Sequence, residues 1–169
     1  MYTEEYCENN LINIGKGASR TVFAINLDYV VKVAHNKFGV DQNIQEMKLF
    51  QKYGKILPLC KIDLYHSNEN YIIMERINTF NVEYNAFDIT QIDMISHLVC
   101  VEQIDNDYIS TLPPVLAEFA NNLLSNELSN DEIRNVLYDV VHYNVGIKDG
   151  KILILDYGFT KELDSEYWE

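Results

Sequence analysis

The sequence of 169 residues predicts an α+β fold, and three observations lead to this class. Short segments rich in Val, Ile and Phe alternate with turns over the first 80 residues. Apolar residues then recur at helical spacing as far as residue 140, and two further strand-like segments follow. We therefore expect a strand-rich first lobe and a helical second lobe that ends in a β-hairpin.

Five strands and one helix are expected in the first lobe. Three of the strands form an antiparallel meander, because Gly-Lys-Gly and Leu-Asp turns separate them. The helix carries Ile44, Met47 and Phe50 at helical spacing and ends at Gly54. In order, we expect strands at 10–15, 20–26 and 29–35, a helix at 42–53 with Asp41 as its N-cap, and strands at 61–66 and 71–77.

Helices are expected to fill most of the second lobe. Asp88 and Gln91 form a capping box ahead of the first helix, and Pro113 and Pro114 open the second. Ser129 is the expected cap of a third, shorter helix. This lobe therefore has three predicted helices before the final hairpin.

Acidic side chains gather in the second half of the sequence. The chain has 13 basic and 26 acidic residues, a formal charge of −13, although residues 1–80 hold nine of each. No Lys or Arg lies between Arg76 and Arg134, so this half would repel a phosphate backbone and we expect no direct binding of nucleic acid. It is either a solubilising surface or a docking face for a protein with a basic surface. The change in charge favours a boundary between 1–77 and 78–169 within one domain.

The cysteine pattern and the short apolar runs favour a cytoplasmic location. Three scattered cysteines without CxxC spacing argue against a disulfide framework and against a cysteine-rich zinc site. No apolar run reaches the roughly 18 residues that a membrane span needs, and the first ten residues are acidic and polar, unlike a signal peptide. We expect a cytoplasmic protein that does not associate with a membrane.

A glycine turn, a strand lysine and a helix glutamate follow one another in the first lobe. Gly15 and Gly17 join two strands, where bare glycines let backbone N–H groups approach phosphate oxygens; an ordinary hairpin turn is the alternative. Lys32 lies within an apolar strand, where an ammonium group needs an anion such as a carboxylate or a phosphate. Glu46, on the following helix, can supply that carboxylate.

A second cluster of polar residues surrounds the predicted hairpin. Asp139 and Asn144 form a D-x-x-x-x-N pattern, and strands at 145–148 and 151–155 flank an Asp-Gly pair, a strong hairpin signal. Asp156 follows the second strand. Such a hairpin can hold Asn144 and Asp156 near one another as oxygen ligands suited to Mg²⁺ with substrate phosphates. A turn capped by Asp139 and a strand that ends at Asp156 explain the cluster equally well.

The order of these signals resembles the signature set of protein kinases. That set runs from a glycine-rich loop through a strand Lys paired with a helix Glu to a catalytic-loop Asp and Asn and then D-F-G; here the last is D-Y-G. The resemblance covers residues 12–159, and 71–77 resembles the strand that runs into the hinge between lobes. It implies a two-lobed protein-kinase-like fold of reduced size, similar to small atypical kinases and to kinase-like proteins of bacteriophages.

The resemblance implies that the protein binds Mg·ATP and transfers a phosphoryl group to a hydroxyl. Asp139 would accept the proton of that hydroxyl, and Asn144 and Asp156 would hold Mg²⁺. Lys32, held by Glu46, would reach the α and β phosphates. The residues expected to contact the rest of ATP are Gly15, Gly17, Val22, Met74 in the gatekeeper position, Glu75 and Ile77.

The chain also departs from the kinase pattern. Arg20 replaces the third glycine of the loop, and Leu137 and Tyr138 stand where His-Arg precedes the catalytic Asp. Val141 stands where protein kinases commonly carry a Lys that touches the γ-phosphate, and only His142 lies near. Eleven residues follow D-Y-G, too few for an activation segment and a peptide-binding platform, so we expect a truncated second lobe.

Three classes of function follow from this pattern. The first is a phosphotransferase that uses Mg·ATP and phosphorylates a Ser, Thr or Tyr hydroxyl of a protein. The second is a non-catalytic, pseudokinase-type binding or inhibitor protein that docks a partner on its acidic second lobe, which the missing substrate platform favours. The third, ranked last, is a small-molecule kinase of the aminoglycoside type, which shares D-x-x-x-x-N but normally devotes a larger helical lobe to its substrate.

Overall fold

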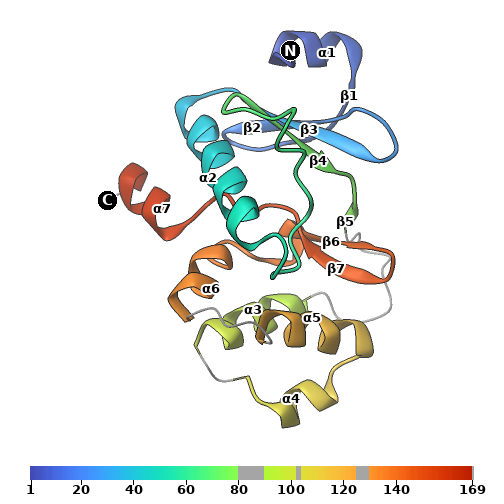
Figure 1. Cartoon of the computed structure of the whole chain (residues 1–169), viewed down its shortest axis with the longest axis vertical. Helices are drawn as coiled ribbons and strands as arrows, with labels where there is room; N and C mark the ends of the chain where they lie inside the picture. The colour runs from blue at the N-terminus through green and yellow to red at the C-terminus, as the bar shows by residue number, and fades with distance from the viewer. Residues whose placement is uncertain (80–89, 102–103, 125–129, 169) are drawn as a thin grey trace.

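The computed structural model describes residues 1–79, 90–101, 104–124 and 130–168. Figure 1 shows a β-sheet above, a hairpin below it and a layer of helices at the far end. The α+β class is confirmed. In chain order the elements are α1 (Glu4–Asn10), β1 (Ile12–Lys16), β2 (Arg20–Ala24), β3 (Tyr29–Ala34), α2 (Lys37–Tyr53), β4 (Tyr71–Glu75), β5 (Asn78–Thr79), α3 (Thr90–Cys100), α4 (Asn106–Thr111), α5 (Pro114–Leu124), α6 (Asn130–Val136), the 3₁₀ turn η1 (His142–Asn144), β6 (Val145–Lys148), β7 (Lys151–Ile154) and α7 (Lys161–Trp168).

Two antiparallel sheets organise the described residues. The first has the order β1-β2-β3-β4, and the second has the order β5-β6-β7. The predicted fifth strand of the first sheet, 61–66, is wrong, because this segment meets β4 at a single isolated bridge, Ile62 opposite Met74, and then turns. Lys61 O accepts from Glu75 N–H, and Asp63 N–H donates to Ile73 O, both in β4. The predicted boundary between 1–77 and 78–169 falls between β4 and β5 and stays a prediction.

Helix α2 begins earlier than the sequence predicts. Its N-cap is Asn36, whose side chain accepts from the Gly39 N–H, and not Asp41. Asp41 lies inside the helix and pairs with Lys37 one turn before it. A Cβ at Gly39 would lie 2.2 Å from the Ser19 carbonyl oxygen, so only glycine allows this turn to pack on the end of the glycine loop. The early start was missed because the first turn contains Gly39, and glycine disfavours a helix.

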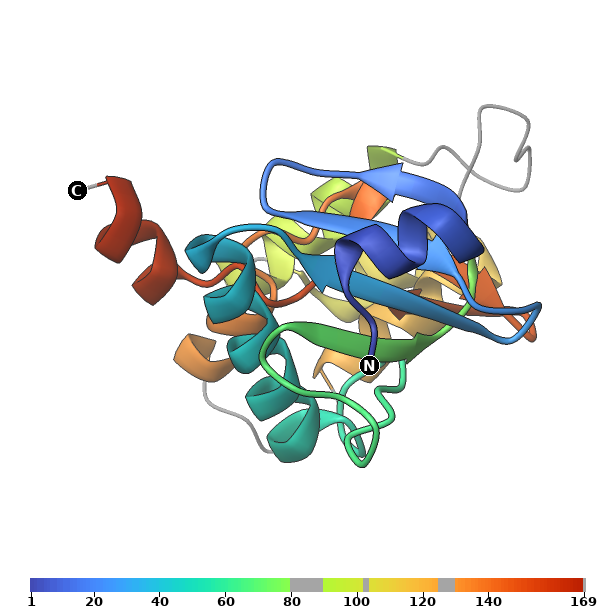
Figure 2. The ribbon, with the colours of Figure 1, turned by 90° about the horizontal axis from the view of Figure 1, so that it is seen from above.

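A second helix accompanies the first sheet, where the sequence predicts only one. Helix α1 lies across the sheet (Figure 2), capped by Thr3, whose side chain accepts from the Tyr6 N–H. It buries Cys7 against Phe23 and Val31 in a small core on the sheet face away from the main core. One buried residue in seven gives no helical period, so the sequence pattern could not reveal this helix.

The helical half packs under the hairpin. Helices α3 and α5 bury Ile92, Ile95, Leu116 and Phe119 in the main core, which continues into β7 and the inner face of the first sheet. The caps predicted at 88 and 129 lie outside the described residues, and α4 was not predicted. No helix in the described ranges is long and apolar enough to cross a membrane.

The hairpin prediction is confirmed in its turn as well as in its strands. β6 and β7 pair antiparallel from Val145 opposite Ile154 to Lys148 opposite Lys151. Asp149 and Gly150 have φ angles of 51° and 77°, the positive values that a two-residue type I′ turn requires. The tight turn fixes the register, and the register places the residues before β6 beside those after β7.

Candidate functional site

Two adjoining hollows lie on the inner side of the first sheet, against the hairpin. The larger, about 750 Å³, contains the glycine turn, and the smaller, about 200 Å³, lies against β4 and the segment after it. They share Gly15, Val22 and Lys32. The polar residues of the larger hollow include Lys16, Ser19, Arg20, Gln42, Asp139, Asn144 and Asp156, and the apolar residues of the smaller include Ile14, Val30, Met74, Ile77 and Leu155.

Strand register brings two cations to one face of the sheet. Arg20 pairs with Ala34 and Val22 pairs with Lys32 along β2 and β3, so the two basic side chains point to the same side. That side is covered by α2, whose Glu46 is fully buried. Lys32 Nζ lies 2.8 Å from Glu46 Oε1, and Arg20 Nη1 lies 2.5 Å from Glu46 Oε2. The predicted Lys32–Glu46 pair is therefore present, with Arg20 as a second partner of the same carboxylate.

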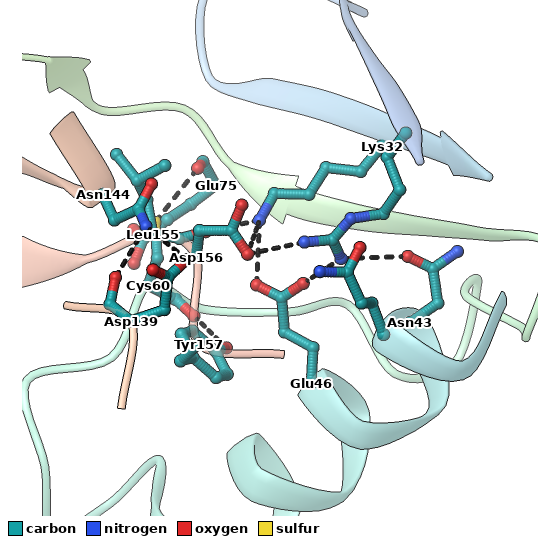
Figure 3. A network of polar contacts seen from close by, with 12 residues as sticks. Lys32, Asn43, Glu46, Cys60, Glu75, Asp139, Asn144, Leu155, Asp156 and Tyr157 are labelled. Atoms are coloured by element: carbon teal, nitrogen blue, oxygen red, sulfur yellow. Dashed lines mark hydrogen bonds and ion pairs between the residues drawn. The ribbon is translucent and has the colours of Figure 1, made fainter. Parts of the chain in front are cut away.

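Asp156 joins this network from the end of the hairpin (Figure 3). Its Oδ1 lies 2.5 Å from Arg20 Nη2 and 3.9 Å from Lys32 Nζ. Lys32 Nζ also donates to the Leu155 carbonyl, which fixes the strand end beside the sheet. Burial raises the pKa of Asp156, but the charges of Arg20 and Lys32 outweigh burial and hold it below the ordinary value. Asp156 is thus kept ionised.

Asp139 and Asn144 are joined by hydrogen bonds around η1. Asn144 Nδ2 donates to Asp139 Oδ2 at 3.1 Å and to the Asp139 carbonyl at 2.7 Å. The Asn144 carbonyl accepts from the Leu155 N–H, so the turn before the hairpin is tied to its second strand. Burial and the negative charge of Asp156 raise the pKa of Asp139, and the bond from Asn144 offsets part of this rise.

The D-Y-G segment is anchored behind the network. Tyr157 is 1 % exposed, and its hydroxyl donates to the Cys60 carbonyl at 3.0 Å. Gly158 lies against α2, where a Cβ would come within 2.5 Å of the Gln42 carbonyl oxygen. The close approach of helix and segment leaves no room for a side chain at this position, so Asp156 is held at a fixed distance from α2.

The segment after β4 lines the smaller hollow. Met74 is buried and lines it together with Ile77. Glu75 turns its carboxylate to other partners, since Oε1 accepts from the Lys61 N–H and Oε2 lies 2.8 Å from Lys148 Nζ on the hairpin. The N–H groups of Glu75 and Arg76 donate to the carbonyls of Lys61 and Asp28. The predicted gatekeeper Met74 and the predicted adenine contacts Glu75 and Ile77 all line the smaller hollow, and the Glu75 side chain also links β4 to β6.

Two side chains near Asp139 have structural partners that sequence reasoning missed. The backbone N–H of His142 donates to Asp93 Oδ1 on α3, and the His142 ring nitrogen Nδ1 lies 2.9 Å from Asp93 Oδ2. His142 is not among the residues that line the larger hollow. Tyr138 OH donates to Asp164 on α7 at 2.5 Å. His142 therefore ties η1 to the helical layer, in contrast with its expected place near a γ-phosphate.

Aromatic side chains form one wall of the larger hollow. Phe38 at the start of α2 meets Phe159 edge to face, with ring centroids 5.7 Å apart, and Tyr138 meets Phe159 at the same separation. Phe38, Phe159 and the exposed Tyr143 line the hollow beside Asp139. Sequence reasoning missed this wall, because its members come from three distant parts of the chain and follow no local period.

Arg20 is the charged site residue whose partners the sequence did not identify. It was singled out only as a departure from a glycine loop. The alternation of side chains along β2 and β3 does indicate that Arg20 and Lys32 lie on one face of the sheet. Lys32 pairs with Val22, two residues after Arg20, and residues two apart on a strand face the same side. The carboxylate of Asp156, 136 residues away, could not be assigned to it from that signal.

The donor set at the hairpin suits a magnesium ion. Asn144 uses its amide nitrogen on Asp139, which leaves Oδ1 as an acceptor, and Asp156 keeps Oδ2 outside the bond to Arg20. Both residues line the larger hollow. In the described residues there is no cluster of three His, Cys, Asp or Glu side chains that could hold a metal by themselves. Mg²⁺ commonly takes one or two protein oxygens and completes its shell with water and phosphate oxygens, which this pair permits.

Comparisons with known proteins find structural relatives. No protein-family model and no curated protein matches the sequence. The gentamicin complex of APH(2'')-IIa matches with a TM-score of 0.53 and 15 % identity, over 94 % of this chain and 70 % of that one. The streptomycin–ATP ternary complex of APH(2'')-IIa matches with a TM-score of 0.52 and 15 % identity, over 94 % and 71 %. The matched proteins are aminoglycoside phosphotransferases, so the predicted protein-kinase-like fold is confirmed.

Proposed function

We propose that this chain, which has the protein-kinase-like fold, binds Mg·ATP and transfers the γ-phosphoryl group to a hydroxyl. The observation that carries the proposal is one network: the buried Lys32–Glu46 pair lies within 4 Å of Asp156, on a hollow that Asp139 and Asn144 also line. The adjoining apolar hollow has the position and the character that an adenine ring requires. A solved relative of the same fold was obtained with ATP.

The nucleotide is held by both hollows. The adenine ring lies in the smaller one between Val22 and Met74, and the backbone of the segment ending at Ile77 binds its polar edge. Lys32 reaches the α and β phosphates, and Gly15 and Gly17 let the loop backbone close over them. Since the N–H groups of Glu75 and Arg76 are bonded within the protein, Ile77 is the candidate N–H donor of this segment.

Chemistry takes place at the hairpin end of the larger hollow. Asp139, oriented by Asn144, accepts the proton from the acceptor hydroxyl as its oxygen attacks the γ-phosphorus; the bond from phosphorus to the β–γ bridging oxygen breaks, and ADP leaves. Asn144 and Asp156 would hold Mg²⁺, which neutralises charge on the phosphate oxygens when it is bound. Lys32 and Arg20 add fixed positive charge on the opposite side, so positioning and electrostatics provide most of the rate increase.

The acceptor is a hydroxyl on a positively charged molecule. The acidic second half of the chain favours a cationic acceptor, which on the sequence prediction is a basic segment of a protein. Amino sugars are the alternative acceptors, since gentamicin and streptomycin are present in the solved relatives. Transfer from labelled ATP to Ser-, Thr- and Tyr-containing basic peptides and to these two amino sugars separates the two acceptors.

Thermal unfolding tests the nucleotide site. A ligand at a hundred times its dissociation constant stabilises the fold by about 2.7 kcal/mol. For a chain of this length, that should raise the unfolding midpoint by roughly 5 to 10 °C with Mg·ATP. Asp156→Ala should lose most of the shift. If the wild type shows no shift with Mg·ATP, the proposed nucleotide site is wrong.

Asp139→Asn tests catalysis separately from binding. The variant should keep the Mg·ATP shift and lose phosphoryl transfer by roughly 10²- to 10⁴-fold, the usual contribution of a general base. Asp149→Asn is the matched control, because Asp149 lies on the exposed hairpin turn with a positive φ that Asn also tolerates. Equal transfer by the wild type and Asp139→Asn would contradict the catalytic role and favour the non-catalytic binding protein.

A further inference from the structure

Arg20 is a buried cation beside the predicted metal ligand, at the end of a loop where a glycine is expected. Its side chain is 5 % exposed and has three acceptors: Glu46 Oε2 at 2.5 Å, Asp156 Oδ1 at 2.5 Å and Asn43 Oδ1 at 3.2 Å. Its carbonyl accepts from the Gly17 N–H, so the same residue closes the glycine turn. An arginine fork held at both ends by carboxylates has a fixed geometry.

This arginine changes the charge of the site. Arg20 and Lys32 face Glu46 and Asp156, so the four side chains together are neutral. Without Arg20, the cluster would carry one negative charge, which would attract a divalent cation. Asp156 already has two cationic partners, Arg20 at 2.5 Å and Lys32 at 3.9 Å.

Arg20 also limits how Asp156 can bind a metal. Oδ1 of the carboxylate bonds the guanidinium and has Lys32 Nζ at 3.9 Å, so Oδ2 lies outside the ion pair with Arg20, and the Gly158 N–H also bonds the carboxylate. The Asp156 side chain is 33 % exposed, in contrast with the buried Arg20, so the open side of the carboxylate faces the hollow. A metal can therefore use one oxygen of Asp156 while the ion pair persists.

We infer that Arg20 is a positioning residue that makes metal binding at Asp156 depend on bound nucleotide. A divalent cation alone meets an Asp156 carboxylate whose charge is already balanced by Arg20 and Lys32, so it binds weakly there, with Asp139 as the remaining anion of the hollow. The phosphates of a nucleotide bring the negative charge that the four side chains lack, so the metal binds together with them. The dependence on nucleotide rests on the proposed function. The weakening of metal binding by Arg20 in the absence of nucleotide does not rest on it.

Titration with Mn²⁺ in the absence of nucleotide tests the inference. Mn²⁺ replaces Mg²⁺ at oxygen sites, and the electron paramagnetic resonance signal of the free ion reports how much is bound. Arg20→Gln should bind Mn²⁺ at least about tenfold more tightly than the wild type. The change removes a unit positive charge a few ångströms from the metal, at a site partly shielded from water. The double variant Arg20→Gln with Asp156→Asn should lose this gain.

A matched control separates a local effect from the overall charge of the chain. Lys16→Gln removes one positive charge from the exposed end of β1, which lines the same hollow, and the affinity for Mn²⁺ should change far less than in Arg20→Gln. Equal effects of the two changes, or no gain in folded Arg20→Gln, would overturn the inference. Circular dichroism spectra of each variant show that the fold is retained.

The wild type alone provides a second measurement, which does not require the variant to fold. Mn²⁺ should bind weakly without nucleotide and at least about tenfold more tightly with ADP, because the phosphates add negative charge beside the metal. Tight binding of Mn²⁺ without nucleotide would overturn the inference even if ATP binds as proposed. If the wild type binds no nucleotide, the proposed function fails, whereas a gain in Arg20→Gln that requires Asp156 would still support the role of Arg20.

Discussion

Asp139 and Asp156 line the same hollow from the two chain segments at the open end of one hairpin, and their surroundings differ. Asp156 faces Arg20 and Lys32, so its pKa is held low although it is largely enclosed. Asp139 has the amide of Asn144 as its hydrogen-bond partner and feels the negative charge of Asp156, so its pKa is raised. One carboxylate is thus fixed as an anion and the other is closer to exchanging a proton, the division that separates a metal ligand from a general base.

The buried network on the Asp156 side depends most strongly on Glu46. Glu46→Gln should lower the free energy of unfolding by about 3–5 kcal/mol, because removing one partner of a buried ion pair leaves charge uncompensated. Lys32 and Arg20 would then share one neutral acceptor. Urea unfolding measures the loss, and the shift with Mg·ATP should disappear with it.

The matched control for Glu46→Gln lies on the same helix. Lys37→Gln removes the Lys37–Asp41 pair in the first turn of α2, where Lys37 is 74 % exposed, and the unfolding free energy should stay nearly unchanged. Similar losses in the two variants would mean that burial of Glu46 contributes little. The contrast between a paired Asp156 and a weakly partnered Asp139 would then have no energetic consequence.

The dependence of stability on pH should separate the two carboxylates by sign. The folded-state pKa of Asp156 is below its ordinary value, so its stabilisation is present above that value and is lost as the pH falls through the folded pKa. The folded-state pKa of Asp139 is above its ordinary value, so ionisation costs stability at neutral pH and acid relieves the cost. At pH 7, Asp156→Asn should be less stable than the wild type, and Asp139→Asn should be more stable.

Unfolding midpoints of the three proteins between pH 3 and pH 8 test this reversal. Asp156→Asn should also flatten the loss of stability in acid, since the group responsible is gone. Changes of the same sign in both variants at pH 7 would show that the two carboxylates do not differ as their surroundings indicate.

The sequence predicted the parts of this site that depend on local pattern. Lys32 and Glu46 were found because an apolar strand and an amphipathic helix each place one charge, and the Asp-Gly turn fixed the hairpin that carries Asp156. The ion pair from Arg20 to Asp156 was missed because it joins residues 136 apart, with no period to connect them. The fifth strand failed because the segment 61–66 meets β4 only at the bridge between Ile62 and Met74 and then turns, which its strand-like composition does not reveal.

The smallest expected loss of stability concerns Tyr157, which follows Asp156 in the chain and helps to position that carboxylate rather than Asp139. Tyr157→Phe removes the buried hydroxyl that donates to the Cys60 carbonyl at 3.0 Å, and should cost about 1 kcal/mol of unfolding free energy, the net value of one hydrogen bond. Tyr143→Phe is the control, because Tyr143 is 64 % exposed and should lose almost nothing.

A positioning role for Tyr157 predicts more than this loss. Since Tyr157 adjoins Asp156, Tyr157→Phe should weaken the Mg·ATP-induced shift and leave the raised pKa of Asp139 in place, which the pH profile of transfer would report. A shift of that pH profile in Tyr157→Phe would mean that the surroundings of Asp156 and the pKa of Asp139 are coupled. An unchanged profile with a smaller ligand shift would show that the D-Y-G anchor acts on the metal ligand alone, and that one hairpin carries two independently tuned carboxylates.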